Sequence, residues 1–341
     1  MRPGKHGGIH DNRLRRLEEQ KMKLGLFTPI YNHLTFDELL DELRHYPQIE
    51  MLEIGTGGWP GSAHIDWSLL ESREKRQGYL QKLADRGICI SALSCHGNPL
   101  HPDAGLAQQD DSLLRRTIEL AEALQVQTVV AFSGCPGGNV EDKTPNWITA
   151  AWPPEFVHML EWQWNERLVP YWQSIARLAE GAGVRIALEA HPGFCVYNPG
   201  TLLRLRTLTG DSIGINLDPS HLWWQGIDIP TAIRELDGAI HHFHAKDLLL
   251  DRHNCSRNGV LDTKNYREIN ARSWTFRSVG WGHDEIEWKG IVSALRMAGY
   301  DGVLSIEHED ALASTREGLS SAVAMLSRVL LKEKPVAAWW A

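Results

Sequence analysis

The sequence predicts a (β/α)8 barrel, and two features of the chain support this fold class. Short apolar runs recur along the whole chain, and each is followed by a longer segment with helical periodicity and a charged face. The runs are almost continuously hydrophobic, as strands buried on both faces of a parallel sheet must be. The eight expected strands begin at Lys23, Met51, Cys89, Thr128, Arg185, Ile213, Ala239 and Gly302.

The segments between these runs have the pattern of amphipathic helices. Several end in glycine just before the next strand, as in "ADRGICIS" and "MAGYDGVLS", which is typical of a helix C-terminus. Eight alternations close naturally into a barrel. A doubly wound sheet is the alternative, but the first strand lacks the glycine-rich turn that dinucleotide binding requires. The expected helices cover 36–45, 68–86, 110–124, 155–182, 199–209, 229–237, 287–298 and 311–331.

The chain of 341 residues is longer than a typical barrel of roughly 250 residues. The surplus falls mainly in 135–154 and 248–286, after the fourth and seventh strands, on the face where barrel active sites lie. We therefore expect one barrel domain over 22–331 with enlarged loops at these two places. Residues 1–21 are expected to be a disordered N-terminal extension or an added leader, and residues 332–341 a C-terminal tail.

Composition excludes several classes of partner. The net charge of −8 argues against nucleic acid, which attracts a basic surface. No apolar run reaches the roughly 18–20 residues that span a bilayer, and the N-terminus has no secretory signal. Five scattered cysteines without a C-x-x-C pair suit the reducing cytoplasm. The C-terminal "AAWWA" indicates a subunit interface, so we expect a cytoplasmic homo-oligomer.

The last four strands end in polar side chains: Glu189, Asp218, His244 and Glu307. Each shares a strand face with small or polar residues, whereas the opposite faces carry large apolar residues suited to packing against helices. The four therefore point into the barrel mouth, although His244 has other histidines beside it. Three carboxylates there repel each other unless a cation lies among them. Three oxygen ligands and one imidazole suit Mn²⁺, with Mg²⁺, Co²⁺ or Zn²⁺ as alternatives, and we expect no organic cofactor.

These residues, the D-x-x-H spacing of Asp218 and His221 in "LDPSH", and the helix entry "DEIEW" resemble the xylose isomerase-like TIM barrel superfamily. Within it the chain is similar to the sugar phosphate isomerase/epimerase family, which includes ketose 3-epimerases and inosose dehydratases. The resemblance covers about 23–330 and implies that the four strand-end residues hold a divalent cation, usually Mn²⁺.

The resemblance also implies further roles. Glu189 and Glu307 would double as acid/base groups, His221 would bind a substrate oxygen, and Arg277 would contact the substrate. Two features depart from the family pattern. No further glutamate follows shortly after Glu189, and the insertion 248–286 is longer than in the compact epimerases.

Loop residues fit a carbohydrate substrate. His96, His191 and Lys246 are candidate partners of sugar hydroxyls, each with a structural role as its alternative; for Lys246 this is a salt bridge with Asp247. No cluster of Arg or of Ser and Gly indicates a phosphate site, so a non-phosphorylated sugar, cyclitol or keto-glycoside is favoured. Indole faces pack against sugar C–H groups, and we expect about two of six loop tryptophans, Trp59 among them, in the pocket. The six are Trp59, Trp152, Trp223, Trp224, Trp274 and Trp281.

These residues predict a metal-dependent isomerase or epimerase. A proton next to a metal-bound carbonyl of a keto-sugar would be removed to give an enediolate and returned to the other face by the second glutamate. With only one competent base, the same intermediate would eliminate water or another group, so a dehydratase or lyase on a keto-inositol or 3-keto-glycoside is the alternative. An apurinic endonuclease is a further alternative, which the single four-residue ligand set and the acidic net charge disfavour. A non-catalytic metal- or sugar-binding subunit is another alternative, which these two features leave open.

Overall fold

A computed structural model describes residues 22–333 together with 336, 338 and 340. The expected extension 1–21 lies outside the described residues, as does half of the expected tail 332–341. Among the described residues, no helix is both long enough and apolar enough to cross a membrane.

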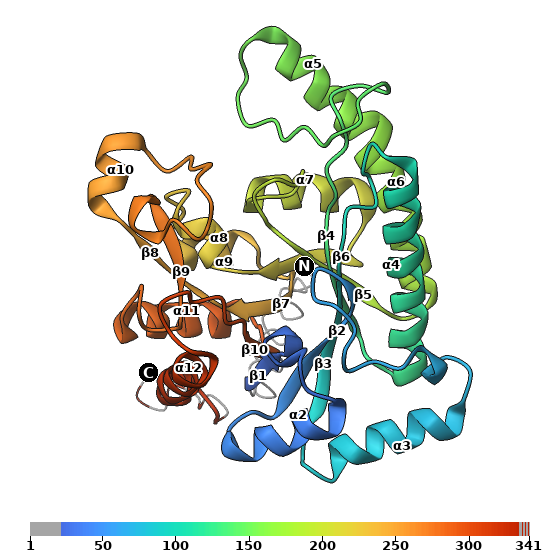
Figure 1. Ribbon diagram of the computed structural model, residues 1–341, viewed down its shortest axis with the longest axis vertical. Coiled ribbons are helices and arrows are strands. Elements are labelled where there is room, and N and C mark those ends of the chain that lie inside the picture. Colours follow the sequence, from blue (N-terminus) through green and yellow to red (C-terminus); the bar gives the residue numbers. More distant parts are fainter. Residues whose placement is uncertain (1–21, 334–335, 337, 339, 341) are drawn as a thin grey trace, which may run out of the picture.

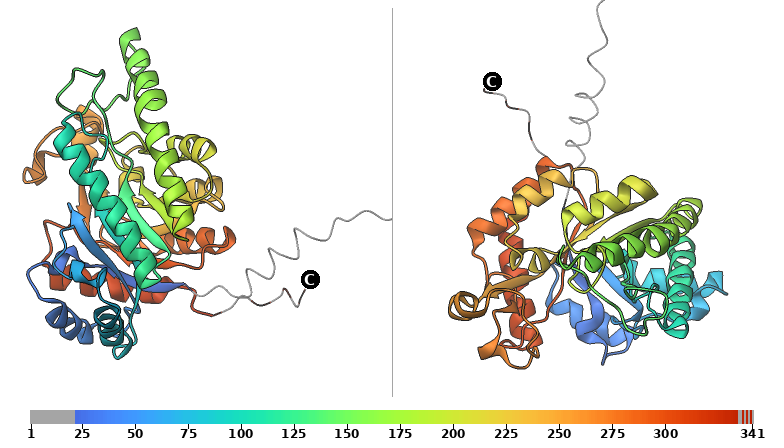
Figure 2. Two further views of the ribbon diagram at one scale, coloured as in Figure 1. Left: turned by 90° about the vertical axis from the view of Figure 1, so that its right-hand side faces the viewer. Right: turned by 90° about the horizontal axis from the view of Figure 1, so that it is seen from above.

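Eight parallel strands close into a barrel in the order β1-β10-β7-β6-β5-β4-β3-β2, with helices packed around it (Figures 1 and 2). The predicted (β/α)8 barrel of a single domain is confirmed. Nearly all residues of the barrel strands are buried, as the apolar runs predict, because both faces of the sheet are covered. The barrel strands are β1 (Lys23–Phe27), β2 (Met51–Gly58), β3 (Cys89–His96), β4 (Thr128–Phe132), β5 (Arg185–Glu189), β6 (Ile213–Leu217), β7 (Ile240–Ala245) and β10 (Val303–Ile306).

The outer helices begin at capping residues that the sequence provides. Thr35 and Ser314 each form a capping box with a glutamate three residues later, which satisfies backbone N–H groups at the helix start. The outward aliphatic residues of the strands pack beneath these helices in one large core. The main helices are α2 (Phe36–Glu42), α3 (Arg73–Ala84), α4 (Ala104–Leu124), α5 (Pro154–Trp162), α6 (Val169–Gly181), α7 (Pro199–Thr209), α8 (Ser220–Trp223), α9 (Ile229–Glu235), α11 (Glu285–Met297) and α12 (Thr315–Val329).

The connection after β4 rises above the barrel and returns through a long helix. A π-helical turn (Gln163–Leu168) joins α5 to α6, and α5 extends well beyond the barrel (Figure 1). The buried Gln163 amide donates to the carbonyls of Pro136, Gly137 and Asn146. Gln163 therefore ties the loop after β4 to the helical segment that follows it, beside the mouth of the barrel.

The insertion after β7 contains regular structure that the sequence reading did not predict. Two short antiparallel strands, β8 (Asp247–Leu250) and β9 (Trp274–Arg277), flank a segment that includes α10 (Arg252–Asn258). Arg272 is buried and lies over the rings of Tyr266 and Trp274, at 4.1 and 4.6 Å from their centroids. This packing brings aromatic side chains of the insertion to the barrel mouth.

Candidate metal centre

The four strand-end residues meet at the carboxyl end of the barrel. We call Glu189, Asp218, His244 and Glu307 the rim cluster. All four are buried, and one ligand atom from each lies within 4.8 Å of the others. The strand register brings them together, since Ser305 on β10 pairs with His244 on β7, and Glu189 pairs with Asn216 on β6.

Three buried atoms of the rim cluster lack hydrogen bonds. They are Asp218 Oδ2, His244 Nδ1 and Glu307 Oε2. His244 Nδ1 lies 2.8 Å from Glu307 Oε2 and 3.4 Å from Glu189 Oε2, although the first contact lacks the geometry of a hydrogen bond. Buried polar atoms are normally paired, so atoms left open toward a common point fit a shared ligand. The donor set, three carboxylates and one imidazole, fits a divalent cation.

The pKa values show how the buried charges balance. Burial raises the pKa of Asp218 to about 6, because nearby cationic groups only partly offset the desolvation of its carboxylate. Burial acts on Glu307 in the same way, but Lys246 and His244 outweigh it and lower the pKa of that carboxyl to about 2. Burial lowers the pKa of His244, yet the carboxylates of Glu53 and Glu307 outweigh this effect and raise it well above its usual range. The site therefore attracts positive charge strongly.

Glu189 is oriented by three side chains in addition to the rim cluster. His96 Nε2 lies 3.0 Å and Asn216 Nδ2 3.2 Å from its Oε2, and His221 Nε2 lies 3.1 Å from its Oε1. The single turn of α8 explains the D-x-x-H spacing, because it places His221 beside Asp218, 3.2 Å from its Oδ2. Burial would raise the pKa of Glu189, but the hydrogen bonds from His221 and His96 outweigh it and lower the pKa well below its usual range.

His191 lies next to this group in the neutral form. Its ring stands 4.1 Å from that of His221, and its Nδ1 donates to the Pro192 carbonyl at 2.7 Å. Burial lowers the pKa of His191 to about 3. With Nδ1 as the donor, Nε2 is left as an acceptor at the cavity wall.

Lys246 pairs with two glutamates. Its Nζ lies 3.1 Å from Glu307 Oε1 and 2.5 Å from Glu309 Oε2, and 4.1 Å from the ring centroid of Phe276. Burial lowers the pKa of Lys246, but these carboxylates outweigh it and raise the pKa well above its usual range. The alternative partner Asp247 instead accepts from His283 Nδ1 at 2.8 Å.

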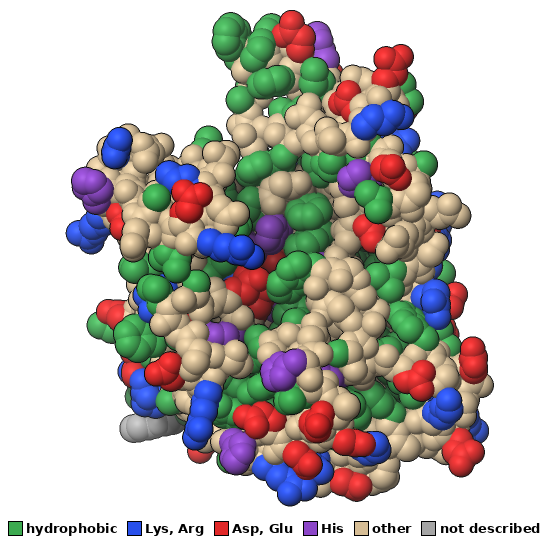
Figure 3. All heavy atoms as spheres, in the orientation of Figure 1, with side chains coloured by type: hydrophobic (Ala, Val, Ile, Leu, Met, Phe, Trp, Pro, Cys, Tyr) green, Lys and Arg blue, Asp and Glu red, His purple; other side chains and the backbone are tan. Residues whose placement is uncertain are grey.

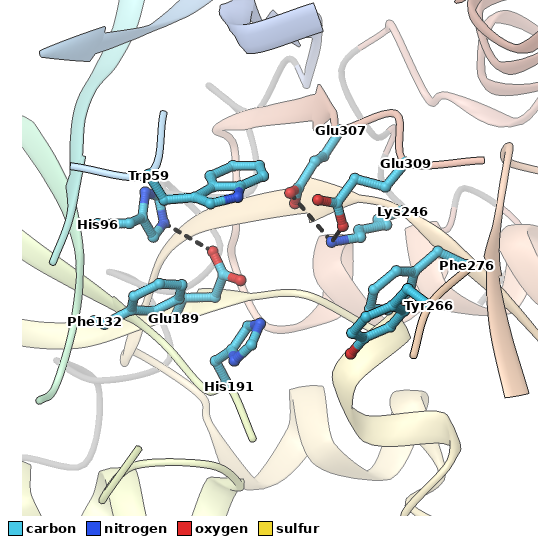
Figure 4. A pocket seen from close by; sticks show the side chains of 10 residues that line it. All are labelled: Trp59, His96, Phe132, Glu189, His191, Lys246, Tyr266, Phe276, Glu307 and Glu309. Carbon is cyan, nitrogen blue, oxygen red and sulfur yellow. Dashed lines mark hydrogen bonds and ion pairs between the residues drawn. The ribbon is translucent and has the colours of Figure 1, made fainter. Parts of the chain in front are cut away.

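A cavity of about 460 Å³ opens over the rim cluster. Figure 3 shows a central hollow with acidic and histidine side chains at its floor and apolar side chains around it. In Figure 4, Glu189 and Glu307 project into the space between Trp59, on one side, and Tyr266 and Phe276, on the other. The cavity is lined by Trp59, His96, Phe132, Glu189, His191, Lys246, Tyr266, Phe276, Glu307 and Glu309.

Some residues selected from the sequence lie elsewhere. Arg277 does not line this cavity; its Nε lies 3.1 Å from Asp310 Oδ2, and its guanidinium lies over Trp281. Of the six loop tryptophans, only Trp59 lines it, one fewer than expected. Trp152 and Trp281 are exposed, and the other three, Trp223, Trp224 and Trp274, are buried.

Sequence reasoning missed four residues of the cavity wall: Phe132, Tyr266, Phe276 and Glu309. Phe132 is the last residue of β4. It would have been found if aromatic residues at strand ends had been considered together with the polar ones. Tyr266 and Phe276 stack with their centroids 5.7 Å apart, a contact between residues of the insertion that no sequence pattern indicates.

Three known proteins are similar to this chain in sequence or in structure. It is 41% identical over 314 residues to the uncharacterized protein YfiH of Bacillus subtilis (strain 168), an alignment covering 91% of this chain and 99% of the relative. The probable 3-DHS dehydratase AsbF from Bacillus anthracis has a similar structure, with a TM-score of 0.63 at 17% identity over 90% of this chain and 99% of that one. The IOLI protein with a bound zinc atom has a TM-score of 0.60 at 20% identity, covering 90% and 98%.

A family model for the xylose isomerase-like TIM barrel matches residues 51–328. The match spans most of the barrel, from β2 to α12, and includes every residue of the rim cluster. The chain belongs to the xylose isomerase-like TIM barrel family.

Proposed function

We propose that the protein is a metal-dependent isomerase or epimerase of a non-phosphorylated keto-sugar. One observation carries the proposal: the carboxylates of Glu189 and Glu307 line the same cavity, beside buried ligand atoms that lack hydrogen bonds. An epimerase needs two acid/base groups on opposite sides of one carbon, and the position of Glu189 and Glu307 in one cavity supports these roles for them.

The rim cluster would hold one divalent cation, with Mn²⁺ first and Mg²⁺, Co²⁺ or Zn²⁺ as alternatives. Three carboxylate oxygens with one imidazole favour these ions over those that prefer thiolates. The zinc bound by the structurally similar IOLI protein supports a divalent ion of this size. When bound, the cation would act as a Lewis acid that stabilises negative charge developing on the substrate oxygens.

The residues around the cation would move and direct the proton. One of the two glutamates would remove the proton next to the substrate carbonyl, and the other, once protonated from solvent or from the Lys246 ammonium beside Glu307, would return a proton to the opposite face. Hydrogen bonds from His96 and His221 keep Glu189 ionised and oriented. Lys246, beside Glu307, would donate a hydrogen bond to a substrate oxygen.

The cavity wall supports an uncharged sugar or cyclitol. Trp59, Phe132, Tyr266 and Phe276 provide apolar ring faces, which pack against the C–H faces of sugars. The one cationic side chain lining this cavity among the described residues, Lys246, is paired with carboxylates and therefore offers little attraction for a phosphate.

A second candidate reaction is elimination of water or of an aglycone from a keto-inositol or 3-keto-glycoside. The protonated Lys246 favours it, because an ammonium beside Glu307 can give a proton to a leaving oxygen. The name of the structural neighbour AsbF, a probable dehydratase, also supports this reaction.

Hydrogen exchange in D₂O distinguishes these reactions. The Mg²⁺-loaded protein would be incubated with ketoses, keto-inositols and 3-keto-glycosides and followed by NMR, with Glu307→Gln as the inactive variant. Glu161→Gln, on α5 away from the cavity, is the control and should behave as wild type.

Deuterium next to the carbonyl with a new diastereomer would support the epimerase. An enone with loss of water or aglycone would establish elimination instead. A protein that binds the ion yet exchanges no proton on any substrate would overturn both and indicate a binding role. The expected homo-oligomer stays a prediction that sedimentation would check.

A further inference from the structure

A second buried carboxylate lies inside the barrel, below the rim cluster. Glu53 is on β2, opposite Phe27 on β1 and Ala92 on β3, and is fully buried. Its side chain reaches across the barrel to β7, where His244 Nε2 lies 2.9 Å from its Oε2 and 3.0 Å from its Oε1. The contact joins residues 191 positions apart in the chain.

Three other side chains donate to the same carboxylate. Ser94 Oγ lies 2.5 Å from Glu53 Oε1, and Ser305 Oγ and His242 Nε2 lie 2.7 and 2.8 Å from Oε2. We call Glu53, Ser94, His242 and Ser305 the lumen cluster. Glu53, His242 and His244 are close enough to bind a metal, but both oxygens of Glu53 already accept hydrogen bonds. Hydrogen bonding within the protein thus accounts for this carboxylate.

The contact with Glu53 keeps a proton on Nε2 of His244. An ionised carboxylate only accepts hydrogen bonds, so the nitrogen facing it must be the donor. Nδ1 faces carboxylates as well, so a cation that binds there would replace a proton on Nδ1, and the neutral imidazole would then keep only its proton on Nε2. Nδ1 is the atom that faces Glu307 and Glu189 in the rim cluster. The ring is also stacked on Phe27, with centroids 5.2 Å apart.

We propose that Glu53 is a positioning residue of the metal centre, which fixes the Nε2–H tautomer of His244 and thereby presents Nδ1 to the cation. The inference rests on the metal site of the proposed function. Metal-bound histidines commonly donate a hydrogen bond from their second ring N–H to a carboxylate. Removal of that carboxylate weakens metal binding or lowers activity. Glu53 would act from the opposite side of the barrel, without touching substrate.

Replacing the carboxylate by an amide tests the role of its charge and its acceptors. In Glu53→Gln one oxygen becomes an NH₂ group, which cannot accept the hydrogen bond of a ring N–H. His244 Nε2 lies 2.9 and 3.0 Å from the two oxygens of Glu53, so the variant keeps one acceptor for this N–H but loses the other acceptor and the negative charge. The preference of His244 for the Nε2–H tautomer, which leaves Nδ1 open to a cation, should therefore weaken.

Binding of Mn²⁺ in the absence of substrate, followed by the EPR signal of the free ion, is the first measurement. We expect E53Q to bind Mn²⁺ roughly 10- to 100-fold more weakly than wild type. His241→Gln is the matched control, because His241 is also buried on β7 but forms its hydrogen bond to the Ile186 carbonyl and belongs to neither cluster. It should retain the wild-type affinity. Urea unfolding with a chelator checks that both variants fold.

Nitrogen-15 NMR of the histidine rings, with the protein saturated by Mg²⁺, reads the tautomer directly. Wild type should show a proton on Nε2 of His244 shifted far downfield by the carboxylate, assigned by its loss in His244→Gln. A proton on Nδ1 would overturn the proposal, and this measurement also decides the matter if E53Q fails to fold.

The two proposals fail in different ways. If wild type binds none of the four divalent ions, the metal site itself is overturned and this inference with it. If wild type binds Mn²⁺ but E53Q binds it equally well, or E53Q and H241Q lose affinity equally, only the role of Glu53 is overturned.

Discussion

The rim cluster and the lumen cluster are both buried and polar, but their hydrogen bonding differs. In the rim cluster Asp218 Oδ2, His244 Nδ1 and Glu307 Oε2 have no hydrogen-bond partner. In the lumen cluster Glu53 accepts from two hydroxyl groups and two imidazoles. Both clusters contain carboxylate and histidine, so residue types alone do not distinguish them.

The difference indicates what each cluster does. An open set of ligand atoms suits an ion from solution, because the ion supplies the missing partner. A closed set suits a permanent support, because it is satisfied before any ligand arrives. The Nδ1 atom of His244 lies in the rim cluster, and its Nε2 atom contacts Glu53 of the lumen cluster. This one imidazole therefore connects the two clusters.

The largest expected effect comes from Asp218→Asn. We expect loss of Mn²⁺ binding and a fall in activity of about 10³-fold, since the cation supplies several kcal/mol of transition-state stabilisation. The chelated variant should be more stable than wild type by about 1–3 kcal/mol, because burial penalises the Asp218 charge. Mn²⁺ titration and urea unfolding would measure both effects.

Asp310→Asn is the control for that stability change. Asp310 is also buried but accepts from Arg277 and Ser278, so its replacement leaves the partly buried Arg277 guanidinium without its carboxylate partner and should destabilise the protein. If D218N were destabilised as much as D310N, Asp218 would be a satisfied structural acid, and the contrast between open and closed clusters would fail.

A smaller effect is expected for Lys246→Met. Lys246 contacts Glu307 and lies 3.8 Å from Asp218, so its ammonium competes with a cation for the same carboxylates. We expect Mn²⁺ affinity to stay the same or increase while kcat falls about 10²-fold through loss of a proton donor to substrate. Loss of Mn²⁺ binding in this variant would show that Lys246 supports the rim cluster instead.

The sequence predicted the barrel and the rim cluster from local patterns. Glu189, Asp218, His244 and Glu307 each follow an apolar run, and parallel strands bring their carboxyl ends to one edge. Glu53 also lies within such a run, in "MLEIG", but in the middle of the strand, where only the barrel closure shows its partners.

The insertion after β7 was the least predictable part of the site. Its contribution to the cavity depends on the pairing of β8 with β9 and on the packing of Tyr266 over Phe276. Arg277 illustrates the same limit, because the family resemblance implied contact with substrate, whereas the fold places Asp310 beside it and leaves it outside the cavity lining. Position in the sequence does not reveal which partner a charged loop residue meets.

Tyr266→Ala should have a moderate effect, confined to substrate binding. Loss of one aromatic face is expected to raise KM by about five- to tenfold, while Mn²⁺ affinity stays at the wild-type value. Steady-state kinetics on the substrate found by NMR would measure the change. Trp152→Ala is the control, because Trp152 is 78% exposed and lies outside the cavity, and its KM should be unchanged. An equal rise in both variants would contradict a specific role for Tyr266.

The smallest expected effect concerns a third histidine of β7, which belongs to neither cluster. His241 lies on the strand face opposite His242 and His244, and its Nδ1 donates to the Ile186 carbonyl at 3.1 Å. Burial, with help from Arg185, lowers the pKa of His241 to about 4. The unfolded chain, with its histidine pKa near 6.5, therefore binds more protons than the native protein between these values, and stability falls as the pH decreases through this window.

His241→Gln keeps a donor for the Ile186 carbonyl but has no group that titrates in this window. Between pH 7 and 5.5 the variant should therefore lose about 1 kcal/mol less stability than wild type. Urea unfolding of the chelated proteins at both pH values would measure it, with Mn²⁺ binding at neutral pH expected to match wild type. An unchanged pH dependence would mean that His241 is protonated in the native state, and the division of β7 into buried, separately satisfied faces would then be wrong.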